Sequence, residues 1–163
     1  MPPHRGWIKC NVDAAFRVES RIGASGGVLR NSDGHFVGAH TKTYDHCLNA
    51  LMVEAWACRD GIRLASTCGV TKLCLETDCL ELVRLWELKE TQRSVLTPVL
   101  KEMHELSLQF SDFELRHISR VCNRVAHELA KQMLGDPGTV EWYSDAPPSI
   151  QHLLEYDCNS SAS

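Results

Sequence analysis

Alternating apolar and polar residues dominate the first third of the chain, a pattern typical of β-strands. The predicted strands run from Trp7 to Asp13, from Ile22 to Arg30 and from His35 to Lys42. The segment Asn31-Ser32-Asp33-Gly34 separates the last two strands and favours a tight turn. Because short connections join antiparallel neighbours, we predict an antiparallel meander.

Three glycines interrupt the second of these strands, at Gly23, Gly26 and Gly27. Glycine weakens a strand unless the chain needs it there. We therefore expect either a β-bulge or the close approach of another backbone at these positions.

A helical period replaces the alternation from about Ala50 to Ala65. The apolar residues with this spacing are Leu51, Ala55, Cys58, Ile62 and Ala65. Further elements are predicted as a strand over Val70–Thr77, a helix holding Leu80, Val83 and Leu88, a helix from about Pro98 to Leu108, a strand over Phe113–Ile118 and a helix over Asn123–Leu134. A meander followed by alternating helices and strands predicts an α/β fold, with a mixed sheet and helices on its faces.

Gly135, Pro137 and Gly138 end the last predicted helix. Beyond them we expect Trp142 and an amphipathic piece, Ile150–Tyr156, to dock on the core. The expected organisation is one domain over residues 1–156, with a core of about 7–134 and a docked tail over 135–156. Residues 157–163 are predicted to be disordered.

Composition narrows the class of protein. The chain has 163 residues, of which 44% are hydrophobic and 23% charged, as in ordinary globular domains. No apolar run approaches the roughly 20 residues that cross a bilayer, so we expect no membrane partner. Seventeen basic against twenty-one acidic residues give a net charge of -4, which excludes nucleic-acid binding through a uniformly basic surface. A local basic stripe, or carboxylates neutralised by cations, is compatible with this charge.

The eight cysteines form no C-x-x-C pair, which argues against a zinc site or a thioredoxin-like site. Cys10, Cys58 and Cys74 lie among apolar residues of predicted elements, where a free thiol behaves as a small hydrophobe. The first residues also lack the apolar core of a signal peptide. We therefore expect reduced thiols and an intracellular protein, nuclear or cytoplasmic.

Three acidic residues stand where strands and a helix could bring them together: Asp13, Glu54 and Asp78. An Asp after a strand is often only a turn or a helix cap, and a helical Glu is often solvated. Glu54, however, is surrounded by apolar residues, where an unpaired carboxylate is costly. Converging carboxylates would repel one another without cations between them, and oxygen ligands suit Mg²⁺ or Mn²⁺.

Four segments carry a resemblance, and they occur in order along the chain. They are Trp7-Ile8-Lys9-Cys10-Asn11-Val12-Asp13-Ala14-Ala15, Val53-Glu54-Ala55-Trp56-Ala57, Leu75-Glu76-Thr77-Asp78-Cys79 and Asn123-Arg124-Val125-Ala126-His127-Glu128-Leu129-Ala130-Lys131. Together they closely resemble the type 1 ribonuclease H-like domain, in particular the domains that end plant non-LTR retroelement reverse transcriptases and their stand-alone derivatives. The resemblance runs from about Pro2 to Tyr156.

This resemblance implies a five-stranded mixed sheet of order 3-2-1-4-5, with the first three strands antiparallel. It also implies hydrolysis of the RNA strand of an RNA/DNA hybrid, read by its shape and its 2′-hydroxyls. Asp13, Glu54 and Asp78 match the family's first three acidic ligands. Two Mg²⁺ or Mn²⁺ ions per site would then activate a water and stabilise the leaving 3′ oxygen, leaving 5′-phosphate products.

The chain departs from the family at the fourth ligand, because His127 stands where a carboxylate is expected. Imidazole is a poorer ligand for Mg²⁺ and adds no negative charge, so we expect weaker activity or a shifted metal preference. The alternative is a surface histidine without a role. His117 matches the spacing of a loop histidine that relays protons in bacterial relatives, but here it falls in a predicted strand.

Substrate contacts are predicted from a short basic stripe. Arg120, Arg124, His127 and Lys131 recur at helical spacing and could contact phosphates beside the metal site, or form a solvated helix face. Residues 79–112 carry four basic against six acidic residues, so the basic extension with which some relatives hold the hybrid is missing.

Two functions follow from these observations. The first is a metal-dependent endoribonuclease acting on RNA/DNA hybrids, as a monomer or as part of a larger polypeptide. The second is a catalytically weakened or inactive ribonuclease H-like module that binds nucleic acid or protein. The three acids favour the first, whereas His127, the acidic charge and the missing extension favour the second.

Overall fold

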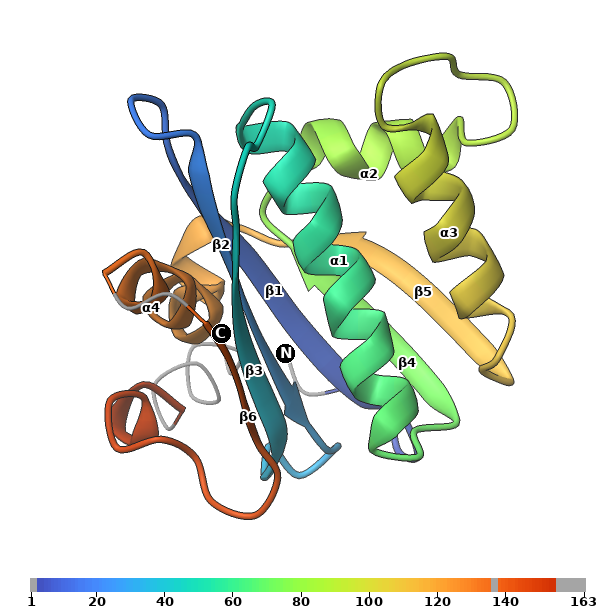
Figure 1. Cartoon of the computed structure of the whole chain (residues 1–163). Coiled ribbons are helices and arrows are strands. Elements are labelled where there is room, and N and C mark those ends of the chain that lie inside the picture. Colours follow the sequence, from blue (N-terminus) through green and yellow to red (C-terminus); the bar gives the residue numbers. More distant parts are fainter. Residues whose placement is uncertain (1–2, 136–137, 155–163) are drawn as a thin grey trace.

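An antiparallel meander at the start of the chain forms the centre of the sheet (Figure 1). The computed structural model describes residues 3–135 and 138–154. Strands β1 (Ile8–Arg17), β2 (Ile22–Arg30) and β3 (Phe36–Tyr44) pair antiparallel in sequence order. Strand β4 (Lys72–Thr77) then pairs parallel with β1, and β5 (Asp112–His117) pairs parallel with β4. This arrangement confirms the predicted mixed sheet.

A sixth strand corrects the predicted count of five. Strand β6 (Thr139–Trp142) pairs antiparallel with β3, which gives the order β5-β4-β1-β2-β3-β6. The predicted order 3-2-1-4-5 is contained in it. Strand β6 escaped prediction because it has four residues, three of them exposed, and so lacks an alternating apolar face.

Strand β1 also continues beyond its predicted end at Asp13. Its pairing with β2 extends to Arg17, which lies opposite Ile22. Asp13 therefore lies within a strand, opposite Gly26, and its backbone is fixed on both sides of the carboxylate.

The predicted helices are confirmed to within a few residues. They are α1 (Ala50–Thr67), α2 (Leu80–Glu87), α3 (Thr97–Ser107) and α4 (Arg124–Met133), with a 3₁₀ turn at Arg120–Cys122. The Asn49 side chain caps α1 by accepting the Met52 N–H at 2.9 Å, and Pro98 lies in the first turn of α3. The apolar stripe of α1 is buried as expected, with Ala55, Cys58 and Ile62 at 0% exposure.

The helices lie on both faces of the sheet (Figure 1). Helices α1, α2 and α3 cover one face, where their side chains join those of β1 and β4 in the larger core cluster. Helix α4 and the tail cover the other face, around Val28, Leu129 and Ile150. Trp142 and Leu153 of the tail pack against this second cluster. Tyr156 and the predicted disordered residues 157–163 lie outside the described residues.

The three glycines of β2 permit close approach. A Cβ at Gly26 would lie 2.6 Å from the carbonyl oxygen of Ala126 and 2.7 Å from the backbone nitrogen of Ala130. The backbone of α4 therefore packs directly on β2. Of the two alternatives predicted for these glycines, close backbone approach is therefore what Gly26 shows, and the shift in the pairing of β2 with β3 lies between Leu29 and Arg30.

The seven described cysteines are free thiols, and Cys10, Cys58 and Cys74 are buried, as predicted. Burial raises the pKa of Cys74 to about 11, which keeps this thiol protonated. Cys158 lies outside the described residues. Among the helices that the structure describes, none has the length and apolar character of a membrane span.

Candidate active site

Strand register brings two of the three predicted acids to the same level of the sheet. Asn11 of β1 lies beside Glu76 of β4 in a parallel pairing. Asp13 and Asp78 each follow two residues later in the chain, so they come next to each other at the end of β4. Glu54 reaches them from the second turn of α1, a helix that packs on β1.

The side chains of Asp13, Glu54 and Asp78, called here the carboxylate cluster, offer oxygen atoms that all lie within 4.8 Å of one another. Burial and the negative charges of Asp13 and Asp78 raise the pKa of Glu54 well above its usual value. Burial and the charge of Asp78 likewise raise the pKa of Asp13, although its contact with His127 opposes the shift. Ionising all three acids together therefore costs free energy through burial and mutual repulsion.

The residues of the carboxylate cluster fit a divalent cation. Glu54 Oε2 is buried and has no hydrogen-bond partner among the described residues. An orphaned carboxylate oxygen beside two further carboxylates is relieved by a cation rather than by another hydrogen-bond acceptor. The donor set is oxygen alone, which suits Mg²⁺ or Mn²⁺.

The structure brings His127 into contact with the carboxylate cluster. His127 Nδ1 lies 2.8 Å from Asp13 Oδ2, while the His127 side chain remains 47% exposed. Its position follows from the packing of α4 on β2 at Gly26. His127 is therefore within reach of the site and has a contact there, unlike a surface histidine without a role.

A second set of buried polar residues supports this site, and sequence reasoning missed it. Asn123 donates from Nδ2 to the Val12 carbonyl oxygen at 2.8 Å and accepts the Asn11 amide at 3.3 Å. Asn11 also donates to Glu76 at 3.2 Å and accepts from Arg30 Nη2 at 3.1 Å. Lys9 Nζ lies 3.0 Å from Glu76 Oε1. We call this set, formed by Lys9, Asn11, Arg30, Glu76 and Asn123, the paired cluster.

The paired cluster fixes the start of α4 on β1, one residue before Asp13. Asn123 precedes α4 directly and is fully buried. One helical turn later comes His127. Asn11 and Glu76 lie inside two of the recognised segments, but nothing in those segments shows that their side chains meet.

The predicted basic stripe is only partly assembled. Arg120 belongs to the 3₁₀ turn before α4, whereas Arg124, His127 and Lys131 belong to α4 itself. Arg120 Nε lies 3.4 Å from Asp78 Oδ2. Arg120, Arg124 and His127 line one surface cavity of about 440 Å³, together with Val121, Glu128 and Leu153. Lys131 is exposed and is not part of that lining.

His117 is not brought into the carboxylate cluster. It is the exposed last residue of β5 and lies opposite Thr77, one residue before Asp78. Its place in a strand, as expected from the sequence, fixes its backbone.

Comparison with known proteins agrees with this arrangement. A family model described as reverse transcriptase-like matches residues 11–133. An Arabidopsis thaliana protein, named provisionally as a ribonuclease H protein, is 25% identical over 155 residues. That match covers 95% of this chain but 25% of the relative, so the chain spans a quarter of its length.

Solved structures with the same fold include three ribonucleases H. The RNase H1 of the halophilic archaeon Halobacterium salinarum has a TM-score of 0.68 at 24% identity, over 80% of this chain and 98% of its own. An N-terminal RNase H domain from Mycobacterium tuberculosis has a TM-score of 0.72 at 17% identity, over 79% and 94%. LC11-RNase H1, solved in complex with an RNA/DNA hybrid, has a TM-score of 0.69 at 14% identity, over 77% and 94%.

The family match extends over most of the chain and includes all three acids of the carboxylate cluster as well as His127. The mixed sheet with its helices matches the fold of the ribonuclease H neighbours. The chain therefore belongs to the reverse transcriptase-like family and folds as a ribonuclease H-like domain.

Proposed function

We propose that this domain hydrolyses the RNA strand of RNA/DNA hybrids with the help of divalent cations. The observation that carries the proposal is the carboxylate cluster, three acids within 4.8 Å on a ribonuclease H-like fold. The relatives support it, since one is named as a ribonuclease H and a structural neighbour was solved with an RNA/DNA hybrid.

Asp13, Glu54 and Asp78 would hold two Mg²⁺ or Mn²⁺ ions, which when bound supply an activated water and neutralise charge on the leaving oxygen. Strand register sets the backbone positions, since Asp13 and Asp78 each lie two residues beyond the paired Asn11 and Glu76. Glu54 has an orphaned oxygen and a pKa raised well above its usual value, so its charge gains most from a cation. The site is thus preorganised for in-line attack on a phosphodiester.

Substrate contacts would come from Arg120 and Arg124, which line the cavity next to His127. Arg120 already lies against Asp78, so binding a phosphate there competes with an internal ion pair. A chain of net charge -4 with so few basic contacts should bind its hybrid weakly, and more weakly as salt rises. Delivery by a longer polypeptide would compensate for this weakness.

The test is cleavage of a labelled RNA/DNA hybrid in Mg²⁺ and in Mn²⁺, with Asp78→Asn as the matched variant. We expect the wild type to leave 5′-phosphate ends, and Asp78→Asn to lose about a hundredfold or more in rate because the amide no longer neutralises a cation. Single-stranded RNA serves as the substrate control. If the wild type cleaves no faster than Asp78→Asn in either metal, the proposed activity is wrong. The alternative function, a binding module without activity, would then remain.

A second variant tests the departure at the fourth ligand. His127→Asp restores a carboxylate next to Asp13, and we expect it to raise Mg²⁺-dependent cleavage relative to Mn²⁺-dependent cleavage. An unchanged ratio of the two rates would place His127 outside the metal site.

A further inference from the structure

Arg120 places a positive charge at the rim of the carboxylate cluster. Its Nε donates to Asp78 Oδ2 at 3.4 Å. The Asp78 side chain is 7% exposed, whereas the Arg120 side chain is 83% exposed. Of the other two acids, Asp13 contacts His127, and Glu54 has a buried oxygen without a hydrogen-bond partner among the described residues. Asp78 is therefore the acid whose charge an arginine of this chain already meets.

The backbone that carries Arg120 is fixed on both sides. Before it, the Ile118 N–H donates to the Thr77 carbonyl oxygen at 2.9 Å. After it, the Asn123 side chain donates to the Val12 carbonyl oxygen at 2.8 Å. Both acceptors directly precede an acid of the carboxylate cluster. In Figure 1 this connection runs from the end of β5 across β1 to α4. The 3₁₀ turn thus holds the Arg120 backbone next to the cluster, whatever the side chain contacts.

The ion pair between Arg120 and Asp78 is easily exchanged. It uses one of the five N–H donors of a guanidinium, and 3.4 Å is long for such a hydrogen bond. Ion pairs with so exposed a partner add little to stability, because water and salt weaken the attraction. Arg120 also lines the cavity of about 440 Å³ that contains Arg124 and His127. Its side chain therefore borders two alternative positions, one on Asp78 and one in that cavity.

A divalent cation and Arg120 compete for the charge of Asp78. A cation in the carboxylate cluster would lie in contact with Asp78, since the three acids offer oxygens within 4.8 Å of one another. Two positive groups this close repel each other. Three carboxylates also attract a divalent cation more strongly than one carboxylate attracts a guanidinium at its edge. We therefore expect the cation to take Asp78 and the guanidinium to leave it.

We propose that Arg120 is an exchangeable internal counter-ion that couples cation binding to substrate binding. It contacts Asp78 while the site holds no cation. A bound cation displaces its guanidinium into the cavity beside Arg124, where the guanidinium binds a phosphate of the substrate. Linkage makes the effect reciprocal, so that cation and substrate each strengthen the binding of the other. This inference rests on the proposed function, because it concerns the same site, but it is tested without cleavage.

The first experiment measures Mn²⁺ binding to the substrate-free protein from the EPR signal of free Mn²⁺, at constant ionic strength. Arg120→Ala should bind Mn²⁺ about two- to fivefold more tightly than the wild type, because no ion pair has to be broken. Arg93→Ala removes the same charge from an exposed position between α2 and α3 and is the matched control. Its affinity for Mn²⁺ should equal that of the wild type.

The second experiment follows the arginine side chain itself by NMR. In protein labelled with ¹⁵N-arginine, the Nε–H signal of Arg120 is identified by its absence in Arg120→Ala. We expect Mg²⁺ to shift this signal saturably in the wild type, because the hydrogen bond to Asp78 is lost. In Asp78→Ala, which has no acceptor there, the signal should lie near that shifted position without any Mg²⁺.

The third experiment measures hybrid binding by fluorescence anisotropy, with and without Mg²⁺. The RNA strand of the hybrid carries 2′-O-methyl groups, which protect it from hydrolysis. Mg²⁺ should tighten binding to the wild type. In Arg120→Ala this gain should be about two- to fivefold smaller, because the released guanidinium is missing. Arg93→Ala should keep the wild-type gain.

Any of three results would overturn the proposal. They are a Mn²⁺ affinity of Arg120→Ala equal to or weaker than that of the wild type, an Arg120 signal that saturating Mg²⁺ leaves unmoved, and an equal Mg²⁺ gain in hybrid binding for both proteins. Because Arg120 is exposed, Arg120→Ala should retain the fold, which circular dichroism checks. The proposed function fails separately, if no hybrid is cleaved although Arg120→Ala binds Mn²⁺ more tightly. Absence of Mn²⁺ binding to all of these proteins up to about 10 mM would overturn both.

Discussion

Two groups of buried polar side chains lie side by side on β1, and they differ in how their charges are met. In the paired cluster Glu76 is bonded to Lys9 and to Asn11, and Asn11 is bonded in turn to Arg30 and Asn123. In the carboxylate cluster Asp13, Glu54 and Asp78 share one sign of charge, and a Glu54 oxygen has no partner among the described residues. The charges of the first group are met by neighbouring side chains, whereas the second group concentrates negative charge that a bound cation would offset. Substitutions should therefore have opposite effects on the two.

The largest effect is expected from breaking the paired cluster. Glu76→Ala leaves Lys9 and the Asn11 amide buried without their carboxylate, and we expect the free energy of unfolding to fall by about 3–5 kcal/mol. Urea unfolding followed by circular dichroism measures it. Glu81→Ala, at an exposed position on α2, is the control and should change stability by less than about 0.5 kcal/mol. An equally small loss in Glu76→Ala would show that the paired cluster does not hold the fold.

A smaller effect of the opposite sign is expected in the carboxylate cluster. Glu54→Gln removes a charge whose pKa is raised by burial and by two neighbouring acids, so without divalent cations it should increase the free energy of unfolding by about 1 kcal/mol. In Mg²⁺ the order should reverse, because the wild type gains more from the bound cation. Urea unfolding in EDTA and in MgCl₂ checks both, with Glu105→Gln as an exposed control. If Glu54→Gln is less stable than the wild type in EDTA, repulsion among the three carboxylates does not destabilise the fold.

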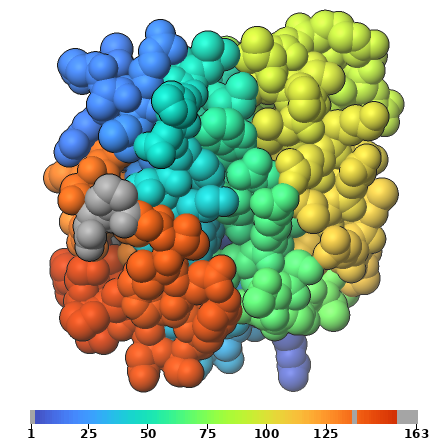
Figure 2. Space-filling view, in the orientation of Figure 1, coloured from blue at the N-terminus to red at the C-terminus, as the bar shows by residue number. Residues whose placement is uncertain are grey.

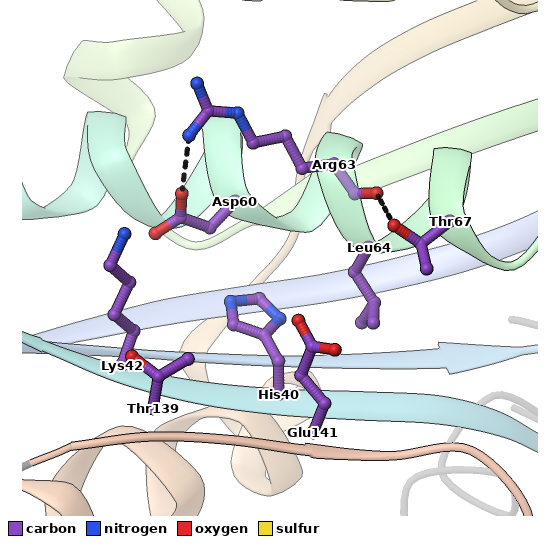
Figure 3. A pocket seen from close by; sticks show the side chains of 8 residues that line it. All are labelled: His40, Lys42, Asp60, Arg63, Leu64, Thr67, Thr139 and Glu141. Atoms are coloured by element: carbon purple, nitrogen blue, oxygen red, sulfur yellow. Dashed lines mark hydrogen bonds and ion pairs between the residues drawn. The ribbon is translucent and has the colours of Figure 1, made fainter.

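The smallest effect concerns a pocket between α1, β3 and β6 that is lined by the buried His40 and Asp60 and is called here the His40 pocket (Figure 3). In Figure 2 the orange β6 segment lies next to the green α1 on this face. Two opposed titrations nearly cancel in this pocket. His40 takes up a proton near its ordinary pKa of 6.5 when unfolded but near 4 when folded, so its contribution to stability is lost as the pH falls through this window. Asp60 takes up a proton at about 6 when folded and at 3.8 when unfolded, so the folded state gains stability over the same fall.

Single substitutions should separate these two contributions. Relative to the wild type, His40→Phe should gain stability between pH 6 and 4, and Asp60→Asn should lose it, each by at most about 1.4 kcal/mol per pH unit. Urea unfolding at intervals between pH 7 and pH 4 provides the measurement. His35→Phe should follow the wild type. Parallel pH profiles for all four proteins would mean that neither group is perturbed by burial.

Much of the site was accessible from the sequence because it depends on local signals. Glu54 in a helix with an apolar stripe, Asp13 in the first strand and Asp78 just after the fourth strand place three acids on three elements, and the resemblance orders those elements. The contact of His127 with Asp13 depends on the close approach of α4 to Gly26. The glycines in the second strand predicted that another backbone comes close, but not which one.

The paired cluster and the His40 pocket could not be anticipated in this way. Each joins residues from at least three elements, and a lone Asn11 or His40 in a strand pattern does not reveal what lies opposite. Strand β6 had a related problem, because its four residues acquire strand structure from pairing with β3 rather than from their own apolar pattern.

Strand β6 and the segment up to Leu154 return to the meander late in the chain, and this affects how the sheet is completed during synthesis. Arg30 Nη1 reaches the Leu154 carbonyl oxygen at 3.5 Å, across 124 residues, and β6 covers the edge of β3. While the chain is being made, β3 therefore stays an open strand edge until about residue 142 has left the ribosome, and open edges invite pairing with other chains. A premature stop between α4 and β6 would leave the carboxylate cluster in the sequence but the sheet prone to aggregation.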